Sequence, residues 1–181
     1  MTPYLGYLAA YQRIRQTKFR LNNILAQTLS KSAIDESGRK LGILKGDILA
    51  FGAEDEVAVL MDYAIYNCPA NGRNAVQVYF EKTPPPPQSE EMAVLKALLE
   101  ARYTLLEVSE KVPGVGLVVK DLRTDEAHFL CDINLGTTAT LPMVLATRVV
   151  AMEGFLMTGG AALPVISPAL NRIARRIYNL G

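Results

Sequence analysis

The spacing of apolar residues changes near the middle of this chain, at the proline run 84–87. Before this run, apolar residues recur every three or four positions, which is the period of an amphipathic helix. From about residue 101 to residue 157 they alternate with polar residues in short runs. Turn signals such as Val112-Pro113-Gly114 and Glu153-Gly154 separate these runs. The pattern predicts an α+β fold, in which a helical N-terminal half precedes a small antiparallel β-sheet or barrel of about five strands and a C-terminal helix.

Capping residues divide the N-terminal half into separate helices. Thr2-Pro3 can start a helix, Gly42 can end one, and Ser89 can start another. The expected helices cover residues 3–29 (one long helix or two abutting ones), 32–41, 53–68 and 74–82, and a fifth starts at residue 89.

The helix expected at 53–68 has a clear apolar stripe. Its members recur at helical spacing and are Val57, Leu60, Met61, Ala64, Ile65 and Cys68. Asp62 lies on the opposite side of this helix, next to Tyr63. A carboxylate beside a phenol can transfer protons, but the helical angles favour a solvated or salt-bridged Asp62.

Five runs of residues beyond the prolines have strand character. They are Tyr103–Glu110, Gly116–Arg123, Ala127–Ile133, Val144–Met152 and Phe155–Thr158. This number of short strands suits an SH3-like or OB-like barrel, or a curled sheet covered by the helices. Val144–Met152 is apolar on both faces, so we expect this strand to be covered on both sides.

The proline run is a stiff spacer and marks the predicted boundary between two parts of the chain. We expect a helical part at 1–83, a helix plus a small sheet or barrel at 88–166, and the C-terminal helix at 167–181. A single compact domain is the alternative.

Composition and charge are those of an ordinary globular protein. Half of the 181 residues are hydrophobic and 20% are charged. The net charge of +1 hides an uneven distribution, because residues 1–50 carry +5, 51–100 carry −5, 101–166 carry −2 and 167–181 carry +3. Basic ends could attract nucleic acid or an anionic surface. The favoured interpretation is that they pack near the acidic segment.

Two cysteines and one histidine limit the metal chemistry open to the chain. Cys68, Cys131 and His128 cannot supply the four ligands of a usual structural zinc site, and they form no disulfide framework. We therefore expect a cytoplasmic protein with reduced, buried cysteines and no cofactor. A secretory signal is not expected, because Arg13 and Arg15 directly follow the apolar N-terminal stretch.

The segment 141–166 is apolar enough to raise the question of a membrane span. Its only charges are Arg148 and Glu153. Such central charges are costly in a bilayer, and glycines together with Pro164 divide the segment into pieces of strand length. We expect buried sheet here and no membrane association.

Several short motifs resemble a known group of sequences. They are Glu54–Tyr63, Asn71–Asn74, Ala101–Tyr103, Val119–Leu122 and Thr158–Pro164. Together they resemble the core of a family of uncharacterised bacterial proteins, whose sheet part is similar to modules found beside SEC-C-type cysteine motifs. This chain lacks the cysteine motif. The resemblance implies a cytoplasmic bacterial protein without an assigned activity, and it implies no site residues.

Asp121, Asp132 and Arg148 are the polar residues of the predicted sheet that could form a site. On adjacent strands the two carboxylates could act as an acid pair or hold a divalent cation. The favoured interpretation is structural, with one or both carboxylates paired to Arg148 or Arg102 so that the sheet is joined to the helices. No catalytic residue and no metal ligand is assigned.

Basic side chains cluster on the first and the last predicted helices. They are Arg13, Arg15, Lys18 and Arg20 at the start of the chain, and Arg172, Arg175 and Arg176 at its end. If both helices contribute to one surface, that surface could follow the phosphates of a nucleic acid.

The leading functional hypothesis is a non-enzymatic interaction protein that binds an unknown protein partner or a second copy of itself. A nucleic-acid-binding protein that uses the basic terminal helices is one alternative. An enzyme that uses Asp121 and Asp132 is the other.

Overall fold

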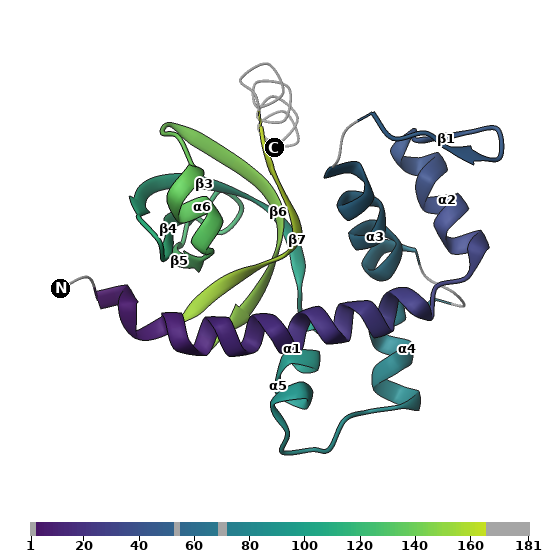
Figure 1. Cartoon of the computed structure of the whole chain (residues 1–181), viewed down its shortest axis with the longest axis horizontal. Coiled ribbons are helices and arrows are strands. Elements are labelled where there is room, and N and C mark those ends of the chain that lie inside the picture. Colours follow the sequence, from purple (N-terminus) through teal and green to yellow (C-terminus); the bar gives the residue numbers. More distant parts are fainter. Residues whose placement is uncertain (1–2, 53–54, 69–71, 166–181) are drawn as a thin grey trace.

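The computed structural model describes residues 3–52, 55–68 and 72–165 (Figure 1). The N-terminal half is helical, as predicted. Its elements are η1 (Pro3–Tyr7), α1 (Leu8–Gln27), α2 (Lys31–Leu41), the short strands β1 (Leu44–Lys45) and β2 (Ile48–Leu49), α3 (Asp55–Asn67), α4 (Ala75–Lys82) and α5 (Glu90–Leu99). The second half contains β3 (Arg102–Val112), β4 (Gly116–Asp121), β5 (Ala127–Cys131), α6 (Ile133–Thr138), β6 (Met143–Met152) and β7 (Phe155–Pro164). The α+β prediction is confirmed, and the predicted C-terminal helix at 167–181 lies outside the described residues.

The five predicted strands close into a barrel in the order β3-β4-β5-β7-β6. Four of the neighbouring pairs are antiparallel. The fifth pair, β5 with β7, is parallel and has a single register partner, Leu130 with Leu156. The expected sheet was antiparallel throughout, and this one contact differs because β7 returns to the barrel beside the end of β5. The barrel is therefore closed by a short seam.

Alternating side chains of the strands form two apolar cores. The barrel interior contains Leu106, Val108, Leu117, Val119, Leu130, Ala139, Leu145, Val149 and Leu156. The second core lies between the barrel's outer surface and the helices, and its buried residues include Ile14, Leu21 and Leu25 of α1, Val94, Leu95 and Leu98 of α5, and Phe129, Cys131, Val150, Phe155 and Met157 of the barrel. β6 contributes to both cores, as its two apolar faces predicted.

The helix α1 joins the two halves of the molecule. In Figure 1 it runs past one side of the barrel and on toward α3 and α4, and it packs closely against α5. At its N-terminal side, the Tyr4 ring stacks on Phe129 of β5 with ring centroids 3.9 Å apart. The helix α1 thus contacts elements on both sides of the proline run, since it packs on α4 and α5 and Lys18 bonds to β7.

Local capping signals located the helix ends well. Gly42 ends α2 in the left-handed conformation at φ 75°. Asn74 and Gln77 form a reciprocal capping box at the start of α4, and Ser89 caps α5. The predicted apolar stripe of α3 is wrong at Val57, which is 47% exposed, whereas Leu60, Ala64 and Ile65 are buried.

Two features of the second half differ from the sequence prediction. The third strand ends at Cys131 rather than Ile133, because Asp132 caps the short helix α6 through the backbone N–H of Leu135. The last strand does not end at Thr158. It continues to Pro164 through Gly159 and Gly160, so this glycine pair lies within β7.

Candidate functional site

Asp121 is a fully buried carboxylate at the end of β4. Its oxygens accept hydrogen bonds from the Thr104 hydroxyl at 2.7 Å and the Arg123 backbone N–H at 2.9 Å, and Arg102 Nη1 lies 2.6 Å away. Burial favours a higher pKa for this carboxyl. The hydrogen bonds and the Arg102 charge outweigh burial and lower its pKa below the usual value. Asp121 therefore joins β3 to β4 as an ionised structural group.

The structure does not bring Asp121 and Asp132 together. In the β4–β5 ladder Asp132 follows the pair Gly116–Cys131, and its backbone N–H donates to the Val115 carbonyl. Asp121 lies at the opposite end of β4, six positions from Val115. At the usual rise per residue this separates Asp121 from Asp132 by about 20 Å. The acid-pair arrangement that an enzyme or a divalent-ion site would need is absent from this sheet. Among the described residues, no group of three or more Asp, Glu, His or Cys is placed to hold a metal ion.

Arg148 connects β6 to α3. Its Nε donates to both carboxylate oxygens of Asp62 at 3.0 and 3.1 Å, and its Nη2 donates to the Asn67 side-chain oxygen at 2.5 Å. The guanidinium carbon also lies 4.2 Å from the centre of the Tyr66 ring. Asp62 is thus salt-bridged, one of the two states expected for it, and only 9% of its side chain is exposed. Burial raises its pKa even though the Arg148 charge acts in the opposite direction.

An irregular stretch of β7 makes room for Arg148. Between the register pairs Thr147–Ala162 and Val149–Thr158, β6 has one residue and β7 has three. A Cβ atom added at Gly159 would lie 2.9 Å from the Cβ of Arg148. The absence of a side chain at Gly159 therefore lets the Arg148 stem lie against β7. The additional residues of β7 also interrupt the ladder, so carbonyl groups there need other partners.

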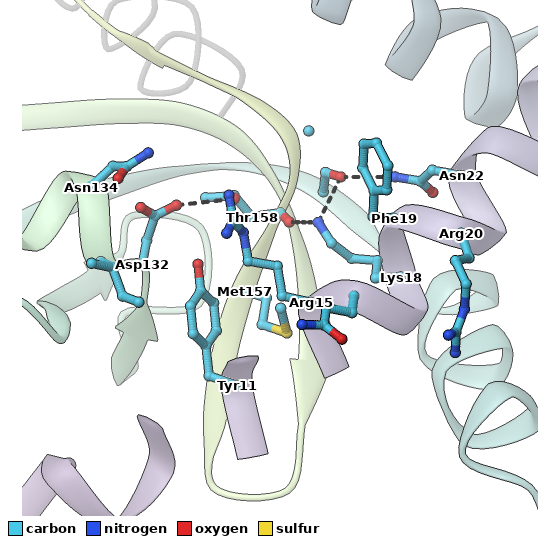
Figure 2. Close-up of a pocket in the computed structure, with 14 residues that line it drawn as sticks. Tyr11, Arg15, Lys18, Phe19, Arg20, Asn22, Asp132, Asn134, Met157 and Thr158 are labelled. Carbon is cyan, nitrogen blue, oxygen red and sulfur yellow. Dashed lines mark hydrogen bonds between the residues drawn. The ribbon is translucent and has the colours of Figure 1, made fainter. Parts of the chain in front are cut away.

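Those carbonyls form part of an open groove between α1 and the barrel seam (Figure 2). Its volume is about 740 Å³. The lining comes from α1, from α6 with its capping residue, and from β7. It consists of Tyr11, Arg15, Gln16, Lys18, Phe19, Arg20, Asn22, Asp132, Ile133, Asn134, Met157, Thr158, Gly159 and Gly160. Of the three polar residues of the predicted sheet that could form a site, only Asp132 lines this groove. Arg15, Lys18 and Arg20, which belong to the basic cluster predicted on the first helix, line it as well.

Lys18 lies in the wall of the groove and supplies hydrogen-bond donors to backbone carbonyls in the irregular stretch of β7. Its ammonium donates to the carbonyl oxygens of Thr158 and, at 2.9 Å, of Gly159, as the dashed lines in Figure 2 show. Asn22 also donates to the Gly159 carbonyl, at 3.3 Å. Burial lowers the pKa of Lys18 to about 8, although the nearby Asp132 charge opposes this change.

The lowered pKa of Lys18 makes stability depend on pH in a defined window. Between pH 8 and 10.5 the native state binds fewer protons than the unfolded state, so this residue adds stability as the pH rises through that range. At pH 7 the buried charge costs about 3 kcal/mol. Urea unfolding at pH 6.5 to 9.5 should show wild type gaining about 2 kcal/mol of stability relative to Lys18→Met, because this range covers only part of the interval between the two pKa values. The control Gln16→Met removes no titrating group and should show a constant difference, and a constant difference for Lys18→Met as well would contradict the assignment.

Asp132, Tyr11 and Arg15 form the other side of the groove. The second oxygen of Asp132 accepts from the Thr158 hydroxyl at 3.4 Å. The Tyr11 phenol points toward Asp132, and Arg15 extends from α1 in the direction of Thr158 (Figure 2). Burial, followed by the Asp132 charge, raises the pKa of Tyr11 to about 12. The same two causes raise the pKa of the Cys131 thiol to about 11, which makes this cysteine a poor nucleophile.

Two of the four basic residues on α1 contact the acidic first turn of α5. Arg13 pairs with Glu90, which also accepts from the Thr17 hydroxyl at 2.6 Å, and Arg20 lies 3.6 Å from Glu91. Arg15 has no hydrogen bond or ion pair to any other described residue. The expectation that basic ends pack near the acidic segment holds for Arg13 and Arg20. Arg172, Arg175 and Arg176 lie outside the residues that the structure describes.

Sequence reasoning grouped Lys18 with the exposed cations of α1 and missed its burial. A signal was present, because Tyr11, Ile14, Lys18, Leu21 and Leu25 follow the helical spacing of a single buried stripe. A lysine in the middle of such a stripe needs acceptors inside the fold, and β7 supplies them. Which carbonyls these are depends on the tertiary structure alone.

Comparisons with known proteins add a family but no activity. In the part of the chain that the structure describes, no helix combines the length and apolar character needed to cross a bilayer. No curated protein and no solved structure is detectably similar to the chain. Residues 7–179 match the family of unknown function DUF7986. The helical segments, the five-stranded barrel and the groove between them thus belong to a member of DUF7986, a family of unknown function.

Proposed function

We propose that this chain is a non-enzymatic interaction protein, and that it binds a segment of another protein in the groove between α1 and the barrel seam. The observation that carries the proposal is the composition of the groove's mouth. Phe19 is 66% exposed there, one helical turn from Arg15, over a groove of about 740 Å³. A large exposed aromatic residue beside an unpaired guanidinium is typical of residues that anchor protein interfaces.

The acids and bases of the barrel support a binding role over catalysis. Asp121 is held by Arg102, Thr104 and a backbone N–H, and Arg148 is held by Asp62 and Asn67. Groups that are fully engaged within the fold are not available to move protons on a substrate. These contacts weigh against the enzyme alternative built on Asp121 and Asp132.

Nucleic-acid binding has less support on α1 than the sequence suggested. Lys18 is buried, and Arg13 and Arg20 are each near a glutamate. Of the four cations on α1, Arg15 alone is exposed and has no hydrogen bond or ion pair to another described residue. One such charge gives little of the phosphate neutralisation on which nucleic-acid affinity rests.

Photocrosslinking within cells tests the proposed contact surface. A photoreactive phenylalanine analogue at position 19 should crosslink the full-length protein to a distinct second protein. The same analogue at Gln27, which is exposed on α1 but outside the groove, should not. The Gly160→Leu change should abolish the crosslink by filling the groove. Equal crosslinking at both positions, crosslinking only to another copy of this chain, or none at position 19 would contradict the proposal.

Two statements implied by the sequence resemblance remain predictions and form part of this proposal. They are a bacterial, cytoplasmic setting and a relation of the barrel to the modules beside SEC-C-type motifs. An interaction protein of this kind would need neither a cofactor nor a membrane.

A further inference from the structure

The polar groups of the groove are mainly hydrogen-bond donors and positive charges. Arg15 has no partner among the described residues. Lys18 uses two of its three ammonium protons on the Thr158 and Gly159 carbonyls. The single carboxylate, Asp132, is already engaged by the Leu135 N–H and the Thr158 hydroxyl. The groove therefore presents unused positive charge, which a carboxylate would complement.

Apolar surface lies directly beside this positive charge. Phe19 follows Arg15 by four residues, so both side chains project from the same face of α1. Met157 belongs to the buried core and also lines the groove. A ligand that places a carboxylate at Arg15 can therefore rest an adjacent apolar side chain on Phe19.

The groove has room for a side chain at its β7 wall. A Cβ atom added at Gly160 would have no heavy atom within 4 Å, whereas one added at Gly159 would meet Arg148. Gly160 thus borders open space and Gly159 borders packed protein. An incoming segment can therefore approach β7 at Gly160 but not at Gly159.

From this charge and shape we infer that the groove recognises an acidic segment of a partner protein, in which a carboxylate pairs with Arg15 and a neighbouring apolar side chain covers Phe19. The inference rests on the proposed function and specifies the partner's chemistry. A guanidinium can hold a carboxylate through two parallel hydrogen bonds, which gives orientation as well as attraction. A chain of phosphates fits less well, because it would meet Asp132 and find Arg13 and Arg20 beside glutamates.

Selection from a random peptide library tests the inference without a known partner. The full-length protein is immobilised, and phage-displayed random dodecapeptides are selected on it. Enriched sequences should contain Asp or Glu next to Leu, Ile, Phe or Met. Fluorescence anisotropy then measures the affinity of a selected peptide for wild type and variants. We expect Arg15→Gln and Phe19→Ala each to weaken binding about tenfold or more, as substitutions of anchor residues do.

Two further variants and one nucleic acid complete the experiment. Gly160→Leu should also weaken binding, whereas Arg13→Gln, two residues from Arg15 but paired with Glu90, should change affinity less than about twofold. Enrichment of basic or uncharged peptides, no enrichment, or binding unaffected by Arg15→Gln would overturn the inference. Arg15-dependent binding of a twelve-nucleotide oligouridylate in place of the peptides would overturn it in favour of nucleic acid. A positive crosslink at position 19 together with a failed selection would remove this inference but leave the proposed function intact.

Discussion

Replacing Arg148 with methionine is expected to lower the free energy of unfolding by about 3–5 kcal/mol. The substitution keeps much of the side-chain volume but leaves Asp62 buried without its counter-charge. Only 6% of the Arg148 side chain and 9% of the Asp62 side chain are exposed, so water cannot replace the lost partner. The variant also loses the hydrogen bond to Asn67 and the contact with the Tyr66 ring. Urea unfolding followed by circular dichroism at neutral pH measures the effect.

A double-mutant cycle separates the ion pair from simple loss of packing. Asp62→Leu combined with Arg148→Met removes both charges, and it should cost clearly less than Arg148→Met alone because no unpaired charge remains. The exposed Arg123 provides the control, since Arg123→Met should change stability by less than about 0.5 kcal/mol. Equal losses for the single and double variants would show that the pair contributes only packing.

The pH dependence of the same variant gives an independent check. Burial already raises the pKa of Asp62 when Arg148 is present, and removing the arginine raises it further. The native state of the variant then binds more protons than its unfolded state above the ordinary carboxyl pKa, so its stability falls as the pH rises. The deficit relative to wild type should therefore shrink on acidification from pH 7 to pH 5.

The local structure of this chain follows from its sequence where short-range chemistry decides it. Ser89 and Gly42 cap helices as predicted, because capping depends only on the neighbouring backbone. The five strands were likewise evident, since alternation and the turns at Gly114 and Gly154 belong to the strands themselves.

Contacts between distant segments account for what the sequence did not predict. Asp62 lies away from the predicted apolar stripe of α3, yet it is buried because Arg148 of β6 lies opposite it. Lys18 is buried because an irregular part of β7 presents two carbonyls to it. Nothing near either residue in the sequence specifies its partner. The groove has the same origin, because it forms only where α1 passes the middle of β7 and the residues that follow β5.

The Gly116→Ala substitution is expected to lower the free energy of unfolding by about 3 kcal/mol or more, beyond ordinary overpacking. An added Cβ would lie 2.1 Å from the Leu130 carbonyl oxygen and 3.1 Å from the Asp132 N–H nitrogen, both of them backbone atoms that cannot rotate away. Gly136 of α6 packs against the same residue, since its own added Cβ would lie 2.6 Å from the Gly116 nitrogen. The two glycines let α6 lie directly on the β3–β4 hairpin.

This close packing connects stability to the groove. Asp132, Ile133 and Asn134, which line one side of the groove, lie at the start of α6. Displacement of the end of β5 and of Asp132 in Gly116→Ala should therefore weaken binding of a selected acidic peptide even at temperatures where the variant remains folded. Gly160→Ala is the matched control in a strand, because its Cβ meets nothing within 4 Å and its stability should change by less than about 0.5 kcal/mol. Urea unfolding and peptide anisotropy on both variants measure the two effects. A Gly116→Ala protein as stable as wild type would show that β4 and β5 can separate at this position and would contradict the prediction.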